Sequence, residues 1–449
     1  MTIDDIVDQS DFVTQQGIDP SKTTIIKVVG VGGGGGNAVG YMFKQGVENV
    51  SFVVANTDKQ ALENSPVPNK VLLGSTGLGA GNNPSVAEEA ANESIEQVGH
   101  IFDDQTKMVF ITAGLGGGTG TGASPVVAKV ARDRGILTIG IVTIPFLFEG
   151  KKKITKALSG ADELSQYVDA MMLINNESLI EIYGDLDFDS AWDKADETLA
   201  TAARSISELI TTRNARINLD FNDVDTTLRN GRTAIISCGF GEGETRVQDA
   251  IDDALRSPLL KNRDIKGAKK LLFNLYYSRD ADQKFQAKEM NAFTSFVTSL
   301  SDVDVIYGVA YDETLGNRVK VTILAAGFDT EIHAADKPVQ GAVTGFGQGP
   351  MDTPAGDDGR LKDQLDQQYG KDKFSALERE SMRRSYVILS PDQMDDDGVV
   401  ERLEKSPAYN RSQDEIRAIT GVGRTSQTTG SFGSRSGESA PGAIDFNDE

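Results

Sequence analysis

The sequence contains few of the residues on which secreted proteins and many enzymes depend. Its 449 residues include one cysteine, Cys238, and two histidines, His100 and His333. One cysteine cannot form an intramolecular disulfide, and two histidines with one cysteine cannot form a zinc cluster. These counts argue against secretion, zinc chemistry and a Ser-His-Asp or Cys-His nucleophile.

Long hydrophobic runs are also missing. The longest apolar stretch, residues 135–148, contains a proline and is shorter than the 18 or so residues that cross a bilayer. The first residues have neither the basic flank nor the apolar core of an export signal. We therefore expect a cytoplasmic protein without direct membrane insertion.

Basic residues are outnumbered by acidic ones. The chain has 45 Lys and Arg against 67 Asp and Glu, a formal net charge of −22 at pH 7. Such a charge repels phosphate backbones and anionic lipid surfaces. We therefore expect no nucleic-acid partner.

Short β-branched runs alternate with longer helical patterns over the first half of the chain, which predicts a parallel sheet covered by helices. The expected strands are residues 25–31, 51–56, 70–74, 107–114, 136–144 and 169–175. The expected helices are 37–46, 84–98, 123–134, 151–168 and, as a long central helix, 190–213. A second block predicts strands at 232–241, 269–277, 303–311 and 318–328, with helices at 243–256 and 284–299.

These patterns predict an α/β fold in which a parallel-sheet nucleotide-binding domain is joined by a long central helix to a smaller α/β domain, followed by a disordered tail. The expected segments are a disordered N-terminal extension (1–23), the nucleotide-binding domain (24–220), the second domain (221–329), a disordered acidic linker (330–398) and a partner-binding peptide with its tail (399–449). After Asp329 the chain has too few aliphatic residues to offset the entropy of ordering.

Glycines gather in three loops, each directly after an expected strand. The first loop spans 30–36, the second spans 74–84 and the third spans 113–125. Backbone N–H groups and a helix N-terminus favour an anion there. Three such loops at successive strand ends predict one ligand with several phosphates along the carboxyl edge of the sheet. The alternative is three unrelated tight turns.

The phosphate site differs from a P-loop, because no G-x-x-x-x-G-K-[ST] motif occurs. Neither the first loop (30–36) nor the third (113–125) contains a lysine, so backbone amides, helix ends and a cation would have to neutralise the phosphates. We expect Mg²⁺, held by phosphates and water rather than by a dedicated protein site.

Five motifs resemble the tubulin/FtsZ family of GTPases: IKVVGVGGGGGNAV, ANTD, GGGTGTGASP, FEGKKK and NLDFNDV. The match covers about residues 24–328. The resemblance implies a GTPase that binds GTP and GDP, polymerises with itself head to tail and forms the cytokinetic ring at mid-cell.

The resemblance also implies roles for individual residues. The phosphate loops are Gly33, Gly34, Gly35, Gly36 and Asn37, and Gly116, Gly117, Gly118, Thr119, Gly120, Thr121 and Gly122. Asn56 and Asp58 match positions near the γ-phosphate and its cation, and Glu149 matches the acid that contacts the ribose. Lys153 stands where the family commonly has an arginine. Lysine keeps the positive charge but lacks the planar, bidentate fork of the arginine guanidinium.

For the base, the resemblance implies that Asn176 and Asp196 hydrogen-bond guanine and that Trp192 stacks on it. A carboxylate can accept from N1–H and the 2-amino group of guanine, a pattern that adenine does not offer. Without the family, Trp192 could equally be a core aromatic residue.

The segment 218–224 carries the only carboxylates that we connect with hydrolysis. Considered without the family, Asp220 has the position and residue type of a helix N-cap. The family resemblance implies instead that Asn218, Asp220 and Asp223 of one subunit position the attacking water at the γ-phosphate of the next.

Near the end, Pro407, Ala408, Tyr409 and Arg411 resemble a family peptide that docks division proteins and membrane-tethering adaptors. Two other function classes stay open. The Gly30-Gly32-Gly35 spacing would suit a dinucleotide-dependent oxidoreductase. A non-hydrolysing filament or binding module would result if Asp220 and Asp223 were only caps.

Overall fold

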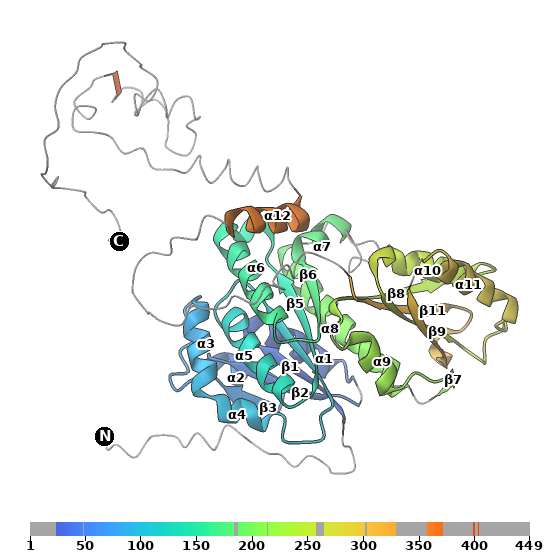
Figure 1. Cartoon of the computed structure of the whole chain (residues 1–449), viewed down its shortest axis with the longest axis horizontal. Helices are drawn as coiled ribbons and strands as arrows, with labels where there is room; N and C mark the ends of the chain where they lie inside the picture. Colours follow the sequence, from blue (N-terminus) through green and yellow to red (C-terminus); the bar gives the residue numbers. More distant parts are fainter. Residues whose placement is uncertain are drawn as a thin grey trace, which may run out of the picture. The chain divides into compact units, whose positions relative to one another are not determined.

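The computed structural model describes residues 24–47, 49–183, 187–212, 214–256, 265–300, 303–328, 357–370, 398–399 and 403 (Figure 1). The chain divides into two units, Met1–Phe374 and Ser375–Glu449. All elements discussed below belong to the first unit.

Six parallel strands form the first half of the sheet, in the order β3-β2-β1-β4-β5-β6. Their bounds are β1 Ile26–Val31, β2 Ser51–Asn56, β3 Asn69–Leu72, β4 Met108–Gly114, β5 Leu137–Ile144 and β6 Ala170–Asn175. Strands β1 and β5 are buried along their whole length, as expected for a parallel sheet with both faces covered.

Helices cover this half of the sheet. They are α1 Gly32–Lys44, α2 Lys59–Asn64, α3 Pro84–Glu93, α4 Ile95–His100, α5 Thr119–Asp133, α6 Lys151–Ser165, α7 Asn176–Tyr183 and α8 Phe188–Thr211. One continuous apolar core joins the strands to α1 and to the long helix α8, with Met42, Phe110 and Ile206 fully buried in it. Helix α5 packs against both α3 and α6.

The second half of the sheet contains β8 Arg232–Gly241, β11 Val319–Ala326, β9 Lys270–Tyr277, β10 Asp304–Tyr311 and β7 Ala215–Ile217, in that order. Strand β8 pairs with β6 through Ala170↔Arg232 and Met171↔Thr233, which joins the two halves. Helices α10 Arg246–Leu255 and α11 Met290–Thr298 share a separate apolar core with these strands. Helix α9 Phe221–Leu228 lies between β7 and β8 in the sequence.

The expected α/β fold class is confirmed, and each expected strand is present within two residues of its predicted bounds. The helix starts differ. Helix α1 begins at Gly32 rather than at residue 37, and α5 begins at Thr119 rather than at 123. The glycines from Gly32 to Gly36, together with Gly120 and Gly122, therefore lie in the first turns of helices, whereas those from Gly116 to Gly118 precede α5. The predicted helix 84–98 is divided into α3 and α4 by Ser94.

Several elements were not predicted, namely α2, α7, β7 and α12 Asp357–Tyr369. Helix α12 falls within the segment 330–398, for which we expected a disordered linker. The N-terminal extension 1–23 and the peptide around Pro407 lie outside the described residues.

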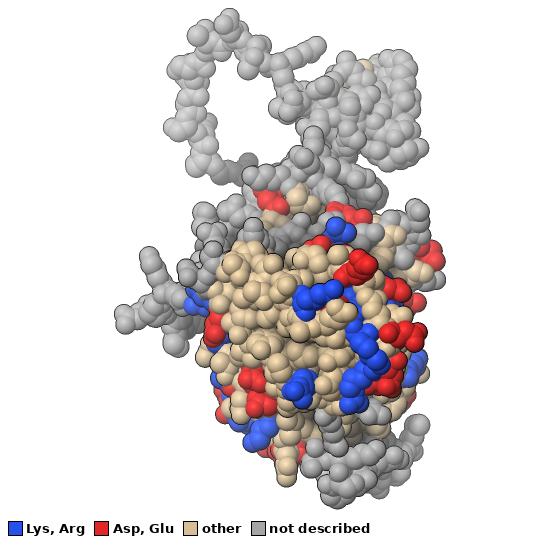
Figure 2. Space-filling view, turned by 90° about the vertical axis from the view of Figure 1, so that its right-hand side faces the viewer, with Lys and Arg blue, Asp and Glu red and all other residues tan. Residues whose placement is uncertain are grey.

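Among the residues that the structure describes, no helix is both long enough and apolar enough to span a membrane. Figure 2 shows the end of the molecule to the right in Figure 1, where α10, α11 and the second half of the sheet lie. Acidic and basic side chains lie beside one another on this face, next to a broad area of other residues.

Candidate nucleotide site

Two helices begin at the carboxyl edge of the parallel sheet without a side-chain cap. Helix α1 follows β1 with Val31 as its N-cap, and α5 follows β4 with Gly118 as its N-cap. Neither helix has an acidic residue in its first turn. Because β1 and β4 are paired neighbours, the free N–H groups of both helix ends converge on one place. This arrangement favours a bound anion.

The glycines at this edge separate into two classes according to what an added Cβ atom would meet. The first class meets nothing within 4 Å and comprises Gly33, Gly36 and Gly117. The second class meets backbone oxygens: Gly35 at 2.1 Å (Thr112 O), Gly120 at 2.4 Å (Gly114 O) and Gly122 at 1.9 Å (Pro84 O). The first class borders open space that phosphates could enter, whereas the second class is required by packing.

The remaining predicted loop glycines also pack closely against neighbouring segments. A Cβ atom at Gly34 would lie 3.3 Å from Gly114, and one at Gly118 would lie 2.8 Å from the Ala80 methyl group. Gly116 has a φ of +100°, which other residues rarely adopt, and faces the carbonyl of Lys153.

The two threonines of the third glycine loop, residues 113–125, have different contacts. The hydroxyl of Thr119 lies 2.7 Å from that of Thr57, which links this loop to the end of β2. Thr121 is buried, and its Oγ1 accepts a hydrogen bond from Gly116 N–H at 2.8 Å. Thr121 therefore closes the loop on itself, while Thr119 ties it to its neighbour.

The loop after β2 places Asn56 and Asp58 beside Thr57. Asn56 is buried, and its Oδ1 accepts from Asp58 N–H at 3.3 Å. Asp58 caps α2 by accepting from Gln60 and Ala61 N–H through Oδ1 alone. Its Oδ2 accepts no hydrogen bond from the part of the chain that the structure describes. One carboxylate oxygen of Asp58 is thus available to a ligand.

Glu149 is held firmly at the turn that follows β5. Its Oε1 accepts from Phe146 N–H at 2.8 Å, and its Oε2 pairs with Lys153 Nζ at 2.5 Å. The Glu149 side chain is 8% exposed, whereas that of Lys153 is 38% exposed. Lys153 therefore contacts Glu149 in this structure.

The predicted base-binding residues come from α7 and α8. Asn176, the first residue of α7, is buried, and its Oδ1 has no hydrogen-bond partner among the residues that the structure describes. Burial, together with the nearby carboxylate of Asp193, raises the pKa of Asp196 to about 7. A buried acceptor without a donor and a carboxyl group with a raised pKa are both features of ligand sites.

Trp192 belongs to an aromatic cluster on the same side of the molecule. Its ring meets that of Phe146 edge-on at 5.0 Å, and Phe148 stacks on Phe146 at 5.0 Å. Trp192 is 37% exposed and Phe148 is 54% exposed. The cluster therefore presents aromatic surface to solvent instead of being sealed in the core.

The predicted catalytic residues form a separate group at the start of α9. Asp220 is the N-cap of this helix and forms a capping box with Asp223. Asn218 and Asp220 are exposed, and Asp223 is half-buried. The structure brings these three residues together in one short segment.

Helix α9 is anchored at the opposite edge of the parallel sheet from the nucleotide loops. Its end continues into Arg229, which lies 3.8 Å from Asp169, the residue before β6. Asn176 directly follows the other end of β6. A strand of this length separates its two ends by roughly 20 Å. The two groups of predicted residues therefore belong to opposite edges.

Two further residues at the carboxyl edge were not predicted. Glu177 Oε2 accepts from Leu147 N–H at 3.0 Å, which connects α7 to the turn that holds Glu149. Asn175 Oδ1 accepts from Glu177 N–H at 2.9 Å. Their position directly after a buried parallel strand was the available signal, because ligands bind at the carboxyl ends of such strands.

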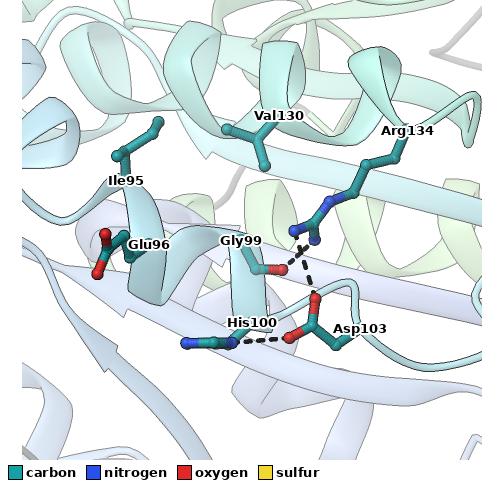
Figure 3. Close-up of a pocket in the computed structure, with 7 residues that line it drawn as sticks. All are labelled: Ile95, Glu96, Gly99, His100, Asp103, Val130 and Arg134. Atoms are coloured by element: carbon teal, nitrogen blue, oxygen red, sulfur yellow. Dashed lines mark hydrogen bonds and ion pairs between the residues drawn. The ribbon is translucent and has the colours of Figure 1, made fainter.

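A pocket of about 450 Å³ lies elsewhere, at the ends of α4 and α5 (Figure 3). It is lined by Ile95, Glu96, Gly99, His100, Asp103, Val130 and Arg134. Arg134 binds the carbonyl of Gly99 and the carboxylate of Asp103, which also binds His100. Because α5 begins at the nucleotide edge, its end at Arg134 lies away from that edge. This pocket is therefore not the predicted site.

No group of three His, Cys, Asp or Glu side chains in the described ranges is placed to hold a metal ion. The candidate site instead offers backbone N–H groups as donors, and one Asp58 carboxylate oxygen and the side-chain oxygen of Asn176 as acceptors. These residues fit a phosphorylated nucleotide whose own oxygens would supply most ligands to a cation.

Comparison with known proteins agrees with the geometry. Residues 25–184 match the model of the tubulin/FtsZ family GTPase domain, and residues 232–329 match the FtsZ family C-terminal domain. The cell division protein FtsZ of Porphyromonas gingivalis is 44% identical over 401 residues, covering 88% of this chain and 87% of that protein. FtsZ of Aquifex aeolicus is 42% identical over 318 residues, covering 70% and 85%. The solved structure of an empty FtsZ dimer of M. jannaschii has a TM-score of 0.61 and 38% identity, covering 71% of this chain and 90% of that one.

Proposed function

The chain belongs to the FtsZ family of tubulin-like GTPases that act in cell division, and from this premise we propose that its active site is completed between successive subunits of a head-to-tail filament. One observation supports the proposal most directly. The loops suited to phosphate and the carboxylates Asp220 and Asp223 belong to opposite edges of one subunit. A contact that joins two different edges is heterologous, and it generates a filament when the rotation between successive subunits does not close a ring.

The nucleotide half of the site would bind GTP largely through backbone amides. The uncapped ends of α1 and α5 would hold the phosphates, with Mg²⁺ bound by the phosphates, by water and by the free oxygen of Asp58. Asn176 and Asp196 would hydrogen-bond guanine, beside the ring of Trp192. Glu149 would contact the ribose, and Lys153 would add a positive charge near it.

The other half would be supplied by Asn218, Asp220 and Asp223 of the neighbouring subunit. Each aspartate uses one carboxylate oxygen in the capping box. The second oxygen of each accepts no hydrogen bond from the described residues. These two oxygens could position the attacking water and accept its proton, a role that requires the assembled contact.

The proposal couples hydrolysis to assembly. Phosphate release from GTP, measured against protein concentration, should give a rate per molecule that rises as subunits associate. Before this measurement, filter binding with labelled GTP, ATP and NAD should show that the protein retains GTP. A rate per molecule that is the same in dilute and in concentrated protein would exclude the shared site. The comparisons do not favour the dinucleotide-dependent oxidoreductase, for which NAD retention would be the sign.

We further propose that the filaments form the cytokinetic ring at mid-cell, tethered to the membrane by an adaptor. The peptide Pro407, Ala408, Tyr409 and Arg411 lies outside the described residues, so its support is the sequence alone. Deletion of 399–419 should leave GTPase activity intact and remove the protein from the division site. A deleted protein that still forms rings would argue against this role.

A further inference from the structure

Helix α12 packs against the carboxyl edge of the parallel sheet, next to α6 (Figure 1). Leu365 is 2% exposed and Tyr369 is 4% exposed, so the helix buries an apolar face. Leu361, Leu365 and Tyr369 follow one another at intervals of four residues, which places them on one side of a helix. Gly370, with a φ of +84°, ends the helix directly after Tyr369.

Three polar contacts hold α12 in place. The hydroxyl of Tyr369 donates to the carbonyl of Pro145 at 2.7 Å, in a buried position. Asn175 Nδ2 donates to the carbonyl of Gln368 at 2.5 Å. The side-chain amide of Gln364 contacts both carboxylate oxygens of Asp162, at 3.1 and 3.2 Å. The last turn of α12 thus bridges the segment after β5 and the end of β6.

Both segments carry predicted guanosine contacts. Pro145 precedes the turn in which Phe146 N–H donates to Glu149, the predicted ribose ligand. Asn175 precedes Asn176, whose buried Oδ1 accepts no hydrogen bond within the described part of the chain. The two segments are also joined to each other, because Leu147 N–H donates to Glu177. A helix that fixes Pro145 and Asn175 therefore fixes the frame of the guanosine site.

The electrostatic surroundings of Tyr369 agree with this placement. Burial raises the pKa of its hydroxyl, and the carboxylates of Glu149 and Glu177 raise it further. Both carboxylates belong to the guanosine side of the site. The hydroxyl remains protonated at neutral pH and so remains a donor to Pro145.

We propose that α12 is a clamp on the guanosine side of the nucleotide site, in which Tyr369 and Leu365 act as positioning residues that slow nucleotide release. The inference rests on the proposed function, since it presumes that guanine nucleotide binds at this edge. It assigns a role to a segment outside both family domains, which end at residues 184 and 329. Neither Tyr369 nor Leu365 contacts the nucleotide in this account.

The test is the dissociation rate of a fluorescent GDP from the full chain, at a concentration too low for filaments to form. Tyr369→Phe removes one buried hydrogen bond and keeps the ring, so release should accelerate about fivefold. Leu365→Ala should accelerate it at least as much, because it loosens the packing of the whole helix. Gln367→Ala is the matched control, since Gln367 is exposed on the same helix. It should release GDP at the wild-type rate.

Two further measurements separate positioning from general damage. The urea unfolding midpoint of Tyr369→Phe should fall by no more than the loss of one buried hydrogen bond explains, and that of Gln367→Ala should equal the wild-type midpoint. In steady-state assays Tyr369→Phe should raise KM for GTP and leave kcat unchanged, because the catalytic carboxylates lie elsewhere. Wild-type dissociation rates in both Tyr369→Phe and Leu365→Ala would overturn the clamp. A wild-type chain that binds no fluorescent GDP would instead overturn the proposed function.

Discussion

Asp220 and Asp223 hydrogen-bond each other's backbone at the start of α9. Asp223 N–H donates to Asp220 Oδ1 at 3.1 Å, and Asp220 N–H donates to Asp223 Oδ2 at 2.8 Å. Each carboxylate therefore has one oxygen engaged in capping and one directed elsewhere. The role of a helix cap and the proposed role in hydrolysis use different atoms, so the two interpretations are compatible.

The capping role and the catalytic role can be separated by Asp220→Asn. Asparagine caps helices about as well as aspartate, so the free energy of unfolding should change by less than about 1 kcal/mol. The GTPase rate in filaments should fall roughly 100-fold, because an amide cannot accept a proton from water. Thr226→Ala, at an exposed position of the same helix, is the control and should keep full activity. If Asp220→Asn keeps the wild-type GTPase rate, the carboxylate of Asp220 has no role in hydrolysis and serves only as a helix cap.

The two classes of glycine predict opposite effects of alanine. Gly122→Ala should destabilise the protein by about 1–3 kcal/mol, because its Cβ would lie 1.9 Å from Pro84 O. Gly117→Ala should change the free energy of unfolding by no more than about 0.5 kcal/mol and should weaken GTP binding. Urea unfolding without nucleotide and GTP titration measure the two effects. Equal destabilisation by both substitutions would contradict the assignment of Gly117 to the ligand space.

Guanine binding should depend on pH through Asp196, whose pKa is raised to about 7 by burial and by Asp193. Below pH 7 the carboxyl group is mostly protonated, and it must lose this proton to accept from both guanine donors. GDP affinity should therefore rise between pH 6 and pH 8. Because GDP itself titrates in this range, the comparison is with Asp196→Asn, whose pH dependence should be flatter. Identical profiles for the two proteins would exclude Asp196 as a guanine ligand.

The same shift affects stability without ligand. The pKa of Asp196 is about 7 in the folded protein, whereas its ordinary value is 3.8. Between these two pH values the folded state therefore keeps a proton that the unfolded state has lost. The contribution of Asp196 to stability is therefore lost as pH rises from about 4 to about 7. Asp196→Asn should remove this loss, which urea unfolding at pH 5 and pH 8 would measure.

Trp192 is the only tryptophan of the chain, so its fluorescence reports on one place. The ring is 37% exposed and lies against Phe146. Guanine stacking on it should quench its emission when GDP is added, and guanosine should act in the same direction at higher concentration. A protein that retains labelled GDP but whose emission does not respond would show that guanine does not stack on Trp192.

The strands were predictable because buried parallel strands are short apolar runs whose surroundings hardly alter the pattern. Strand β5, for example, is apolar or β-branched apart from Gly140 and is buried throughout. The glycine loops were recognised as phosphate sites from their position after such strands. Their division into open and packed positions could not be predicted, because Thr112 and Pro84, which contact Gly35 and Gly122, are distant in sequence.

Helix α12 was missed for a different reason. The composition around it resembles that of a linker, and its apolar residues are only Leu361, Leu365 and Tyr369. Their spacing of four residues and the following Gly370 were visible helix signals. What the sequence could not indicate is the surface that receives them, since Pro145 and Asn175 lie about two hundred residues earlier.

The most direct test of the shared active site is complementation between two inactive variants. Gly117→Asp should place a negative charge among the phosphates and leave Asp220 and Asp223 intact, while Asp223→Asn should do the reverse. In a randomly mixed filament about a quarter of the contacts would join an intact nucleotide edge to an intact carboxylate pair. An equimolar mixture should hydrolyse GTP although neither variant does so alone. A mixture whose phosphate release equals the sum of the two separate rates would contradict the shared active site.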